Sequence, residues 1–467
     1  MLQARRKFSM LVILALIVSL LGACGGSNSG NKPSASNDSN GPTAEAGGKE
    51  TDNKSGSDEV IVLKYATTPE TAVAQSTKDL MALVEKKLGN VRLEPLIIPG
   101  EGTDWNKKVT ISLMAGDEMD IIYQNATTFQ KFATANLIEP LDDWIAEDNY
   151  DVKSIYGSSM STFNGKTYML PAFRDVHITM YNKDLFDRAG IPYPDNNTWT
   201  WDKYVEAAKA ISQLGDGIYG SYMLDWDPYF MFSARQKKVP EYKEDGTSNY
   251  DDPAFAESMK FFYDLGNEWK VQPDFITFRS KKMPWDSFLA EGKYGMFVVG
   301  NWALQSAMND TQYPRNWKMG VAIMPQVNEG EKISLGIMGG YSVAATSKNK
   351  KAAFEAAKVL AESQWELPGN VPARIDLKQE DVNAILNPMA EKLSKDDITV
   401  ENLRDAILDP EMDIVNEKIV GKGMTAITTM ITSEGELYAS KQRSLEETMK
   451  VLKEKSDQAI KDDNSSS

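Results

Sequence analysis

The sequence contains very few residues of the two types that most often build redox, metal and acid–base centres. Its 467 residues include one cysteine, Cys24, and one histidine, His177. A single cysteine cannot form a disulfide within the chain, so the fold must be held together by its hydrophobic cores. A single histidine excludes most zinc sites and every mechanism that needs a pair of histidines. We therefore expect no metal site and no bound cofactor.

Positive charge is also scarce. The chain has 51 lysines and arginines against 67 aspartates and glutamates, which gives a formal net charge of −16. Proteins that bind nucleic acid need basic patches to neutralise the phosphates. The acidic excess therefore argues against a nucleic-acid partner, and we attribute it to the solubility of an exported protein.

The motifs of common enzyme classes are missing as well. The sequence has no Gly-x-Ser-x-Gly elbow, no Walker A loop and no His-Glu-x-x-His helix. Residues 421–426 fit a loose Gly-x-Gly-x-x-Ala pattern without a βαβ frame, and residues 243–247 lack the alternating carboxylates of an EF-hand, so we interpret both as turns. Acidic residues are abundant enough for a glycosidase pair, but no spacing indicates one. We assign no catalytic residue.

The first residues have the form of an export signal. A basic stretch at 5–7 precedes an apolar run at 11–21, which is too short to span a bilayer. The run ends in Leu-Gly-Ala-Cys at 21–24, which resembles the lipobox of bacterial lipoproteins. The resemblance implies that a signal peptide, 1–23, is removed and that Cys24 is lipidated, because two or more acyl chains anchor a protein stably. The alternative is an ordinary signal peptide with an incidental cysteine.

Two segments are too polar to fold. Residues 25–58 are mostly serine, asparagine, glycine, lysine and aspartate, and they cannot bury enough surface to form a core. Together with Cys24 they are predicted to form a flexible tether, 24–58, between the membrane and the folded body. Residues 462–467 are predicted to be a disordered polar tail.

The folded body begins with alternating strand and helix signals. A chain of this length suggests two or more domains or lobes, and a hydrophobic share of 42% supplies their cores. The apolar patterns predict strands at 60–66, 91–98 and 120–123, with helices at 71–88 and 105–114 between them. This alternation indicates βαβ units and a parallel sheet covered by helices.

A later stretch, 290–308, has the form of a strand that ends at a ligand crevice. The apolar run 294–299 predicts a buried strand, and Gly300, Asn301 and Trp302 lead from it into a new helix. In α/β sheets, ligands lie at the carboxyl ends of strands, and the wide ring of Trp302 with its single N–H donor suits stacking against a ligand. The alternative is a core tryptophan that closes a strand–helix corner.

Several segments of the body carry short motifs in a fixed order. They are Asn-Gly-Lys-Thr-Tyr-Met-Leu-Pro at 164–171, Tyr-Asn-Lys-Asp-Leu-Phe at 181–186, Thr-Trp-Asp at 200–202, Asp-Pro-Tyr-Phe at 227–230, Glu-Gly-Lys-Tyr-Gly-Met at 291–296 leading into Gly-Asn-Trp at 300–302, and Gly-Gly-Tyr-Ser-Val at 339–343 with the helix 350–363. Their order resembles family 1 of the extracellular solute-binding proteins, which includes the maltose- and maltodextrin-binding proteins of ABC importers. The resemblance covers the body from 60 to about 455.

This resemblance implies an α/β fold of two lobes with the ligand in the cleft between them. Each lobe would be a mostly parallel sheet flanked by helices, and glycine and proline at two of the crossings suit hinges. The crossings are expected near 172–179, 336–341 and 368–372. The expected lobes are 59–172 with 337–371, and 173–336 with 372–461.

The resemblance also implies aromatic contacts to the ligand. Trp302 matches the tryptophan of the family's Asn-Gly-x-Trp motif, and Tyr229 matches the tyrosine of its Glu-Pro-Tyr-Phe motif. Trp226 is a neighbouring candidate. Tyr341, at the second crossing, is a further candidate with a packed hinge residue as its alternative. The stretch 418–427 has no aromatic residue where maltodextrin-binding members carry a tryptophan. This absence argues against binding of an α-glucan in the way those members bind it.

Polar candidates follow the strand ends and the crossings. Their charged groups can bind hydroxyl pairs through charge-assisted hydrogen bonds, and each candidate has a solvated surface residue as its alternative. We interpret His177 as a buried or hydrogen-bonded crossing residue. The candidates are Thr67, Thr68 and Glu70 after the first strand, Gln124 and Asn125 after the third, Arg174 and Asp175 at the first crossing, and Arg374 after the third crossing.

The function implied by the resemblance is that of a non-enzymatic receptor anchored by lipid on the extracellular face of a bacterial cell membrane. It would capture a carbohydrate, an oligosaccharide, by lobe closure and deliver it to the permease of an ABC importer. We expect it to be a monomer. The alternative from another class is a cell-surface polysaccharide-active enzyme or a carbohydrate-binding adhesin.

Overall fold

The structure is a computed structural model of the whole chain. It describes residues 60–100, 102–125, 128–160, 162–215, 217–366 and 371–465. The predicted signal peptide, Cys24, the tether, residues 368–370 of the third crossing and the end of the polar tail lie outside the described residues. Within the described part of the chain, no helix is long and apolar enough to cross a membrane.

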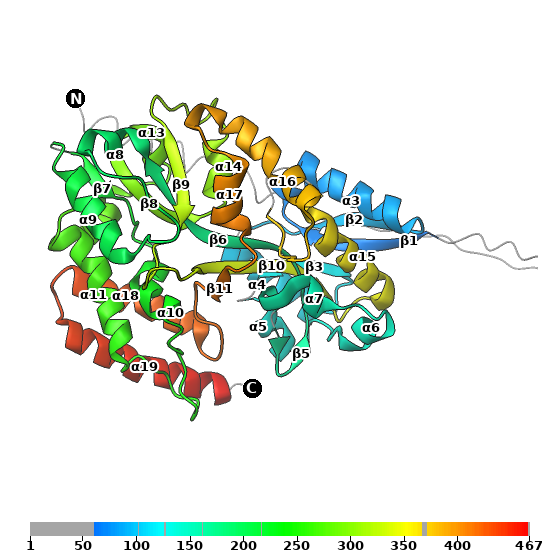
Figure 1. Cartoon of the computed structure of the whole chain (residues 1–467). Helices are drawn as coiled ribbons and strands as arrows, with labels where there is room; N and C mark the ends of the chain where they lie inside the picture. The colour runs from blue at the N-terminus through cyan, green and yellow to red at the C-terminus, as the bar shows by residue number, and fades with distance from the viewer. Residues whose placement is uncertain are drawn as a thin grey trace, which may run out of the picture. The chain divides into compact units, whose positions relative to one another are not determined.

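A nine-stranded sheet runs through the described body in the order β2-β1-β3-β10-β6-β8-β7, with β11 beside β10 and β9 beside β6 (Figure 1). A separate hairpin pairs β4 with β5. The strands are β1 (Ile61–Thr67), β2 (Val91–Ile97), β3 (Ile121–Asn125), β4 (Thr162–Phe163), β5 (Lys166–Thr167), β6 (Leu170–Asn182), β7 (Tyr219–Ser221), β8 (Tyr294–Gly300), β9 (Met319–Ile323), β10 (Ile333–Val343) and β11 (Asp413–Asn416).

Two long strands, β6 and β10, join the two ends of this sheet. They have 13 and 11 residues and run antiparallel to each other. At one end β1 pairs parallel with β2 and β3, as the predicted βαβ units require, and at the other β7 pairs parallel with β8. The antiparallel pairs of β10 with β3, and of β6 with β8 and β9, arise because β6 and β10 pass between the two ends. The sheet is therefore mixed.

The two ends of the sheet have separate hydrophobic cores. Side chains alternate across a strand, so Leu63 of β1 packs with α3 and α15 on one face, while Ala66 packs with α4 and α5 on the other. A third and larger cluster surrounds β8 and β9 and includes Phe186 and Phe297. We call the part built on β1, β2 and β3 the first lobe, and the part built on β7, β8 and β9 the second lobe.

Short polar residues begin several helices, as the sequence predicts. Thr200 accepts a hydrogen bond from the backbone N–H of Lys203, which satisfies a donor that the first turn of α9 leaves free. The single helix expected at 71–88 is divided into α2 and α3 because Ala74 is not helical.

The α-helices are α2 (Pro69–Val73), α3 (Gln75–Leu88), α4 (Gly102–Met114), α5 (Phe129–Thr134), α6 (Asp142–Glu147), α7 (Val152–Tyr156), α8 (Lys183–Ala189), α9 (Trp201–Ser212), α10 (Phe232–Gln236), α11 (Pro253–Asn267), α12 (Phe275–Lys281), α13 (Ser287–Glu291), α14 (Ala303–Ala307), α15 (Lys350–Ser363), α16 (Gln379–Lys392), α17 (Val400–Leu403), α18 (Met424–Ala439) and α19 (Leu445–Ser465).

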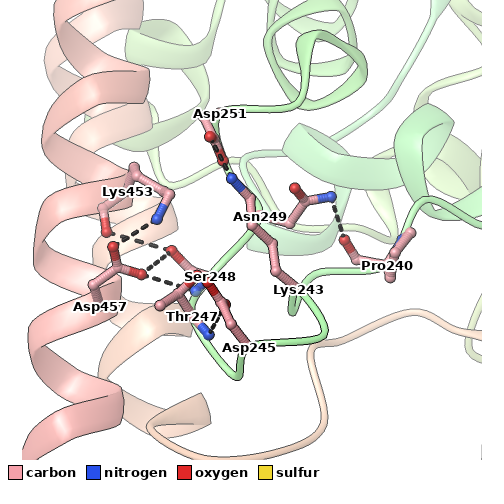
Figure 2. Close-up of polar contacts among 9 residues, drawn as sticks. All are labelled: Pro240, Lys243, Asp245, Thr247, Ser248, Asn249, Asp251, Lys453 and Asp457. Atoms are coloured by element: carbon pink, nitrogen blue, oxygen red, sulfur yellow. Dashed lines mark hydrogen bonds and ion pairs between the residues drawn. The ribbon is translucent and has the colours of Figure 1, made fainter.

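The acidic turn at 243–247 is a hairpin held on α19 (Figure 2). The backbone N–H of Lys243 donates to the carbonyl of Thr247 at 2.8 Å, and Asp245 accepts from the N–H and the hydroxyl of Thr247. Ser248 donates both its N–H and its hydroxyl to one carboxylate oxygen of Asp457, each at 2.8 Å. Among the described residues no group of three or more His, Cys, Asp or Glu side chains is placed to hold a metal ion.

Replacing Asp457 with alanine should destabilise the protein by about 1–2 kcal/mol, because two donors of Ser248 lose their acceptor. Although burial alone would raise the pKa of Asp457, its bonds to Lys453 and Ser248 lower it. A lowered folded-state pKa means that the stabilisation is present above about pH 4 and is lost as the pH falls further. Urea unfolding at pH 7 and pH 3 measures the difference.

The matched control is Glu454→Ala, which removes an exposed carboxylate from the same helix. It should change the free energy of unfolding little at either pH. An Asp457→Ala effect that stays constant between pH 7 and pH 3 would show that the ionised carboxylate does not hold the loop.

Candidate functional site

A pocket lies where β1 and β3 end and the chain turns into α2 and α5. Its volume is about 460 Å³, within the range of small-molecule sites. Hydroxyl, amide and aromatic side chains from the first lobe and from the crossing strands line it. The lining includes Thr67, Trp105, Asn106, Gln124, Asn125 and Tyr341.

Stacked aromatic rings form one wall of this pocket. The rings of Tyr123 and Phe173 lie 5.7 Å apart at an interplanar angle of 9°. Both rings pack over Gly339 of β10, where a Cβ atom would clash with the Tyr123 hydroxyl and lie 2.5 Å from the Phe173 ring. The neighbouring Tyr341 is 1% exposed, and its hydroxyl donates to Oε1 of Gln364 at 2.9 Å. Tyr341 is thus a packed residue of the crossing that also lines the pocket.

Gln124 brings an unpaired amide to the pocket. The residue is buried, and neither its Nε2 nor its Oε1 has a hydrogen-bond partner within the described part of the chain. The indole N–H of Trp105 is also buried without a partner there. A buried polar group without a partner costs about 1–3 kcal/mol. A ligand that carries hydroxyls can both donate to the amide oxygen and accept from the amide nitrogen.

The other candidates at these strand ends have local roles as well. Thr67 is buried and lines the pocket. Thr68 accepts from a backbone N–H of α2, and Asn125 accepts from the backbone N–H of Thr128 at 3.2 Å. Both also line the pocket, so their side chains fix the strand-to-helix turns that shape it. The side chain of Glu70 lies outside the described residues.

Three tryptophans of the second lobe meet at the carboxyl end of β8. The ring of Trp302 lies 4.9 Å from that of Trp285, at 81°, and 6.1 Å from that of Trp226. A core tryptophan would be buried, whereas Trp302 is 37% exposed. Trp226 stacks on Tyr229 at 5.9 Å and 5°, while Tyr229 itself is buried and donates its hydroxyl to the carbonyl of Val298 at 2.6 Å. Tyr229 is therefore buried, and its ring packs against the ring of Trp226.

Trp285 is a member of this cluster that the sequence analysis missed. It lies between α12 and α13, where no strand end or recognisable motif draws attention to it. Its ring contacts both Trp302 and Tyr313. Only the packing of segments that are distant in the sequence brings it to the carboxyl end of β8.

Asp175 of β6 lies against Trp302. A Cβ atom at Gly300 would lie 2.6 Å from Oδ1 of Asp175 and would clash with Nε1 of Trp302, so glycine lets both groups approach the strand end. Oδ1 is buried and has no hydrogen-bond partner among the described residues. Burial and the charge of Glu417 raise the pKa of Asp175 to about 8, although the backbone N–H groups of Asn301 and Trp302 lower it in part. At neutral pH the carboxyl of Asp175 is therefore protonated in most molecules.

Asp175 also connects the tryptophan cluster with the first-lobe pocket. Residues two apart on a strand share a face, so Asp175 follows Phe173 along the pocket side of β6. Burial, followed by the charges of Tyr65 and Asp175, raises the pKa of Tyr123 in the pocket wall. Asp175 therefore lies between the first-lobe pocket and the cluster of Trp226, Trp285 and Trp302.

The remaining candidates lie away from the pocket. Arg174 occupies the alternate face of β6 and is buried, which lowers its pKa to about 10. Arg374 pairs with Asp376 at 2.7 Å and is not one of the described residues that line the pocket. His177 is buried with Nδ1 at 3.0 Å from the carbonyl of Leu335, and burial lowers its pKa.

The sequence profile of one protein family covers most of the first lobe and much of the second. The family is described as bacterial extracellular solute-binding protein, and its profile matches residues 74–366. The chain belongs to this family. The match includes α3, α4, β3, both long crossing strands and the Trp302 strand end, whereas β1 and α2 precede it.

Curated relatives of this solute-binding protein match over about half of the chain. A protein of Brucella abortus (strain 2308) that is named as a binding protein is 26% identical over 264 residues, which cover 56% of this chain and 62% of that protein. The maltotriose-binding protein of Pyrococcus abyssi is 24% identical over 263 residues, which cover 55% of this chain and 53% of that protein. The chain thus spans between half and two thirds of the length of these binding proteins.

Solved structures of similar proteins match nearly end to end. An ABC substrate-binding protein of Listeria monocytogenes in complex with cycloalternan has a TM-score of 0.68 at 21% identity and covers 86% of this chain and 99% of its own. A maltose-bound protein of T. maritima has a TM-score of 0.66 at 18% identity and covers 85% and 99%. At these identities the similarity establishes the fold. The expected two-lobed α/β fold class is confirmed.

Replacing Asp175 with asparagine should stabilise the protein increasingly as the pH rises. The folded-state pKa of about 8 lies above the value of about 4 in an unfolded chain. Below pH 4 both states bind the proton, whereas between pH 4 and pH 8 unfolding releases it, so the stability of the wild type falls as the pH rises. Asparagine has the same shape and no charge. Urea unfolding at pH 5, 6.5 and 8 measures the growing difference.

The control is Asp376→Asn, because pairing with Arg374 lowers the pKa of Asp376 and its titration window lies below pH 4. Its effect on stability should be constant between pH 5 and pH 8. If the effect of Asp175→Asn is constant over that range too, the carboxyl of Asp175 is not held in its protonated form by the fold.

Proposed function

We propose that the protein is the solute-binding receptor of an ABC importer and that it captures a carbohydrate, an oligosaccharide, between the first-lobe pocket and Trp302. The observation that carries this proposal is a pocket of hydroxyl and amide groups, including the unpaired amide of Gln124, beside an exposed indole ring. Sugars combine hydroxyls with C–H faces that pack on aromatic rings. Relatives named as maltotriose-binding and, in Halalkalibacterium halodurans, arabinooligosaccharide-binding support the ligand class.

The side chains take different roles in this proposal. Trp302 and Trp226 stack on the sugar faces. Asp175 bonds a hydroxyl at the centre of the cleft, because its protonated carboxyl can donate as well as accept. Polar contacts in the first lobe come from Thr67, Glu70, Gln124 and Asn125.

The other predicted ligand residues act indirectly. Tyr229 supports Trp226, and Tyr341 holds the pocket wall through Gln364. Arg174 and Arg374 position the crossings, since one is buried on the alternate face of β6 and the other is paired with Asp376.

A ligand bound by both lobes would hold the protein in a closed form that a transporter can recognise. A ligand that contacts groups on two lobes stabilises the closed arrangement by the difference in its affinity for the two states. Lys131 of α5 and Thr425 of α18 already share a hydrogen bond between the lobes. We place the lobes at 59–172 with 337–371, and at 173–336 with 372–461, with β6 and β10 as hinges.

The rest of the chain suits a membrane-anchored receptor. We propose that Cys24 is lipidated on the extracellular face of the bacterial cell membrane and that the tether 24–58 lets a monomeric body reach the transmembrane permease. Support comes from the Leu-Gly-Ala-Cys sequence at 21–24 and from the polar composition after it.

A thermal-shift screen tests the ligand class. The probes are neutral mono- and oligosaccharides, with amino acids and peptides as controls, and the sample is the body from residue 58 onward, which forms its own compact unit. A ligand that binds only the folded state raises the melting temperature in a saturable way. A shift with a saccharide series and no change in saccharide mass is expected. A shift with peptides alone would reject the carbohydrate ligand, and saccharide cleavage would support the enzyme alternative.

Replacing Trp302 with alanine should weaken binding of the saccharide found in that screen by about 1–3 kcal/mol, because the stacking face is lost. Isothermal titration calorimetry measures the affinity. Trp302→Phe is the matched control, since a smaller ring keeps part of the stacking surface and should lose less. A sharp fall in melting temperature with unchanged affinity in the folded fraction would assign Trp302 to the core.

A further inference from the structure

The first-lobe pocket contains no basic side chain among the described residues that line it. Its polar groups are the hydroxyls and amides of threonine, tyrosine, asparagine and glutamine, and the indole N–H of Trp105. The residues next to it in the sequence that the structure does not describe, 101 and 126–127, are glutamate, alanine and threonine, and the side chain of residue 70 is a glutamate. Neither the described lining nor these neighbours offer a cation to an acidic ligand.

Two backbone donors at the pocket are also occupied. The first turns of helices expose N–H groups that attract anions. Here Thr68 accepts from the N–H of Thr71 at the start of α2, and Asn125 accepts from the N–H of Thr128 just before α5. The first turn of α4 carries a carboxylate, Asp104. Neutral side chains therefore occupy these two backbone donors, and the carboxylate at the start of α4 is paired with Lys108.

Glu417, which follows β11, adds negative charge on the other side. Asp175 lies beside Trp302, and the charge of Glu417 acts on it. Glu417 in turn lies 3.5 Å from Nδ1 of His177, whose pKa burial lowers, so this imidazole is a weak source of positive charge. An anionic ligand would meet the charge of Glu417 and the neutral carboxyl of Asp175 here.

Of three basic side chains at the crossings and on α5, two have partners, and Arg174 is buried with no hydrogen-bond partner for its Nε in the described structure. Arg174 lies on the face of β6 away from the pocket lining. Lys131 donates to Thr425, and the charge of Asp463 acts on it. Arg374 is bound by Asp376. A ligand carboxylate that entered the pocket would lose its hydration and gain no ion pair, which is costly.

We propose that the site selects neutral glycans and rejects glycans that carry carboxylate, sulfate or phosphate groups. This inference rests on the proposed carbohydrate-receptor function and deepens it. An acidic group in the pocket would be desolvated and unpaired, which disfavours acidic glycans. The amide and hydroxyl groups of the pocket can each donate a hydrogen bond to a sugar hydroxyl or accept one from it, which favours neutral glycans.

Calorimetric titration of the full chain in detergent solution tests the proposal. The probes are neutral tri- and tetrasaccharides of glucose, galactose, xylose and arabinose, each compared with a counterpart that carries one uronic acid. Neutral saccharides should bind, and the acidic counterpart of the tightest one should bind about tenfold to a hundredfold more weakly. Equal or tighter binding of an acidic counterpart overturns the proposal and leaves the carbohydrate receptor intact. Failure of every saccharide to bind overturns both.

A charge-insertion variant tests the physical cause. Asn106 lines the pocket from α4 and is half-buried, so Asn106→Lys adds a cation there, while Asn106→Gln keeps the amide as the matched control. The lysine variant should reduce the ratio of the acidic to the neutral dissociation constant at least about fivefold, and the glutamine variant should leave it unchanged. An unchanged ratio in both variants would show that the missing cation is not the source of the selectivity.

Discussion

The pairing of β6 with β10 is the constraint on which the rest of the structure depends. These strands join the two ends of the sheet, and they approach closely because glycine occupies the contact positions. A Cβ atom at Gly336 would clash with the carbonyl of Asp175, and one at Gly340 would clash with the carbonyl of Leu170. The same pairing sets the positions of Phe173 and Asp175 on β6 and of Tyr341 on β10. The register of two strands therefore decides how a first-lobe pocket faces a second-lobe tryptophan.

The chemistry of the site follows from which polar groups this pairing leaves unpaired. Thr68 and Asn125 bond to the backbone next to them, but the fold leaves the amide of Gln124 and one oxygen of Asp175 buried without partners in the described structure. Such groups cost stability in the free protein, and a ligand that bonds to them recovers that cost on binding. Because Asp175 holds a proton near neutral pH, the unpaired groups are neutral amide and carboxyl functions. They match hydroxyls better than they match charges.

Sequence analysis could predict the features that depend on local pattern. It placed Trp302 at the end of a buried strand and Gln124 at the end of another, because apolar runs and turn residues mark strand ends. It could not predict the contacts between distant segments. The contribution of Trp285, the burial of Tyr229 behind Trp226 and the pairing of Arg374 with Asp376 depend on how the segments pack. Motif matching finds a residue type, whereas exposure decides whether its side chain can touch a ligand.

A crystal structure of the protein with the tightest-binding neutral saccharide of the titration panel tests the central claim most directly. The account predicts a sugar ring stacked on Trp302, with hydroxyls bonded to the amide of Gln124 and to the carboxyl of Asp175. Density for the saccharide at another surface, with Gln124 and Asp175 still unpaired and Trp302 open to solvent, would contradict it.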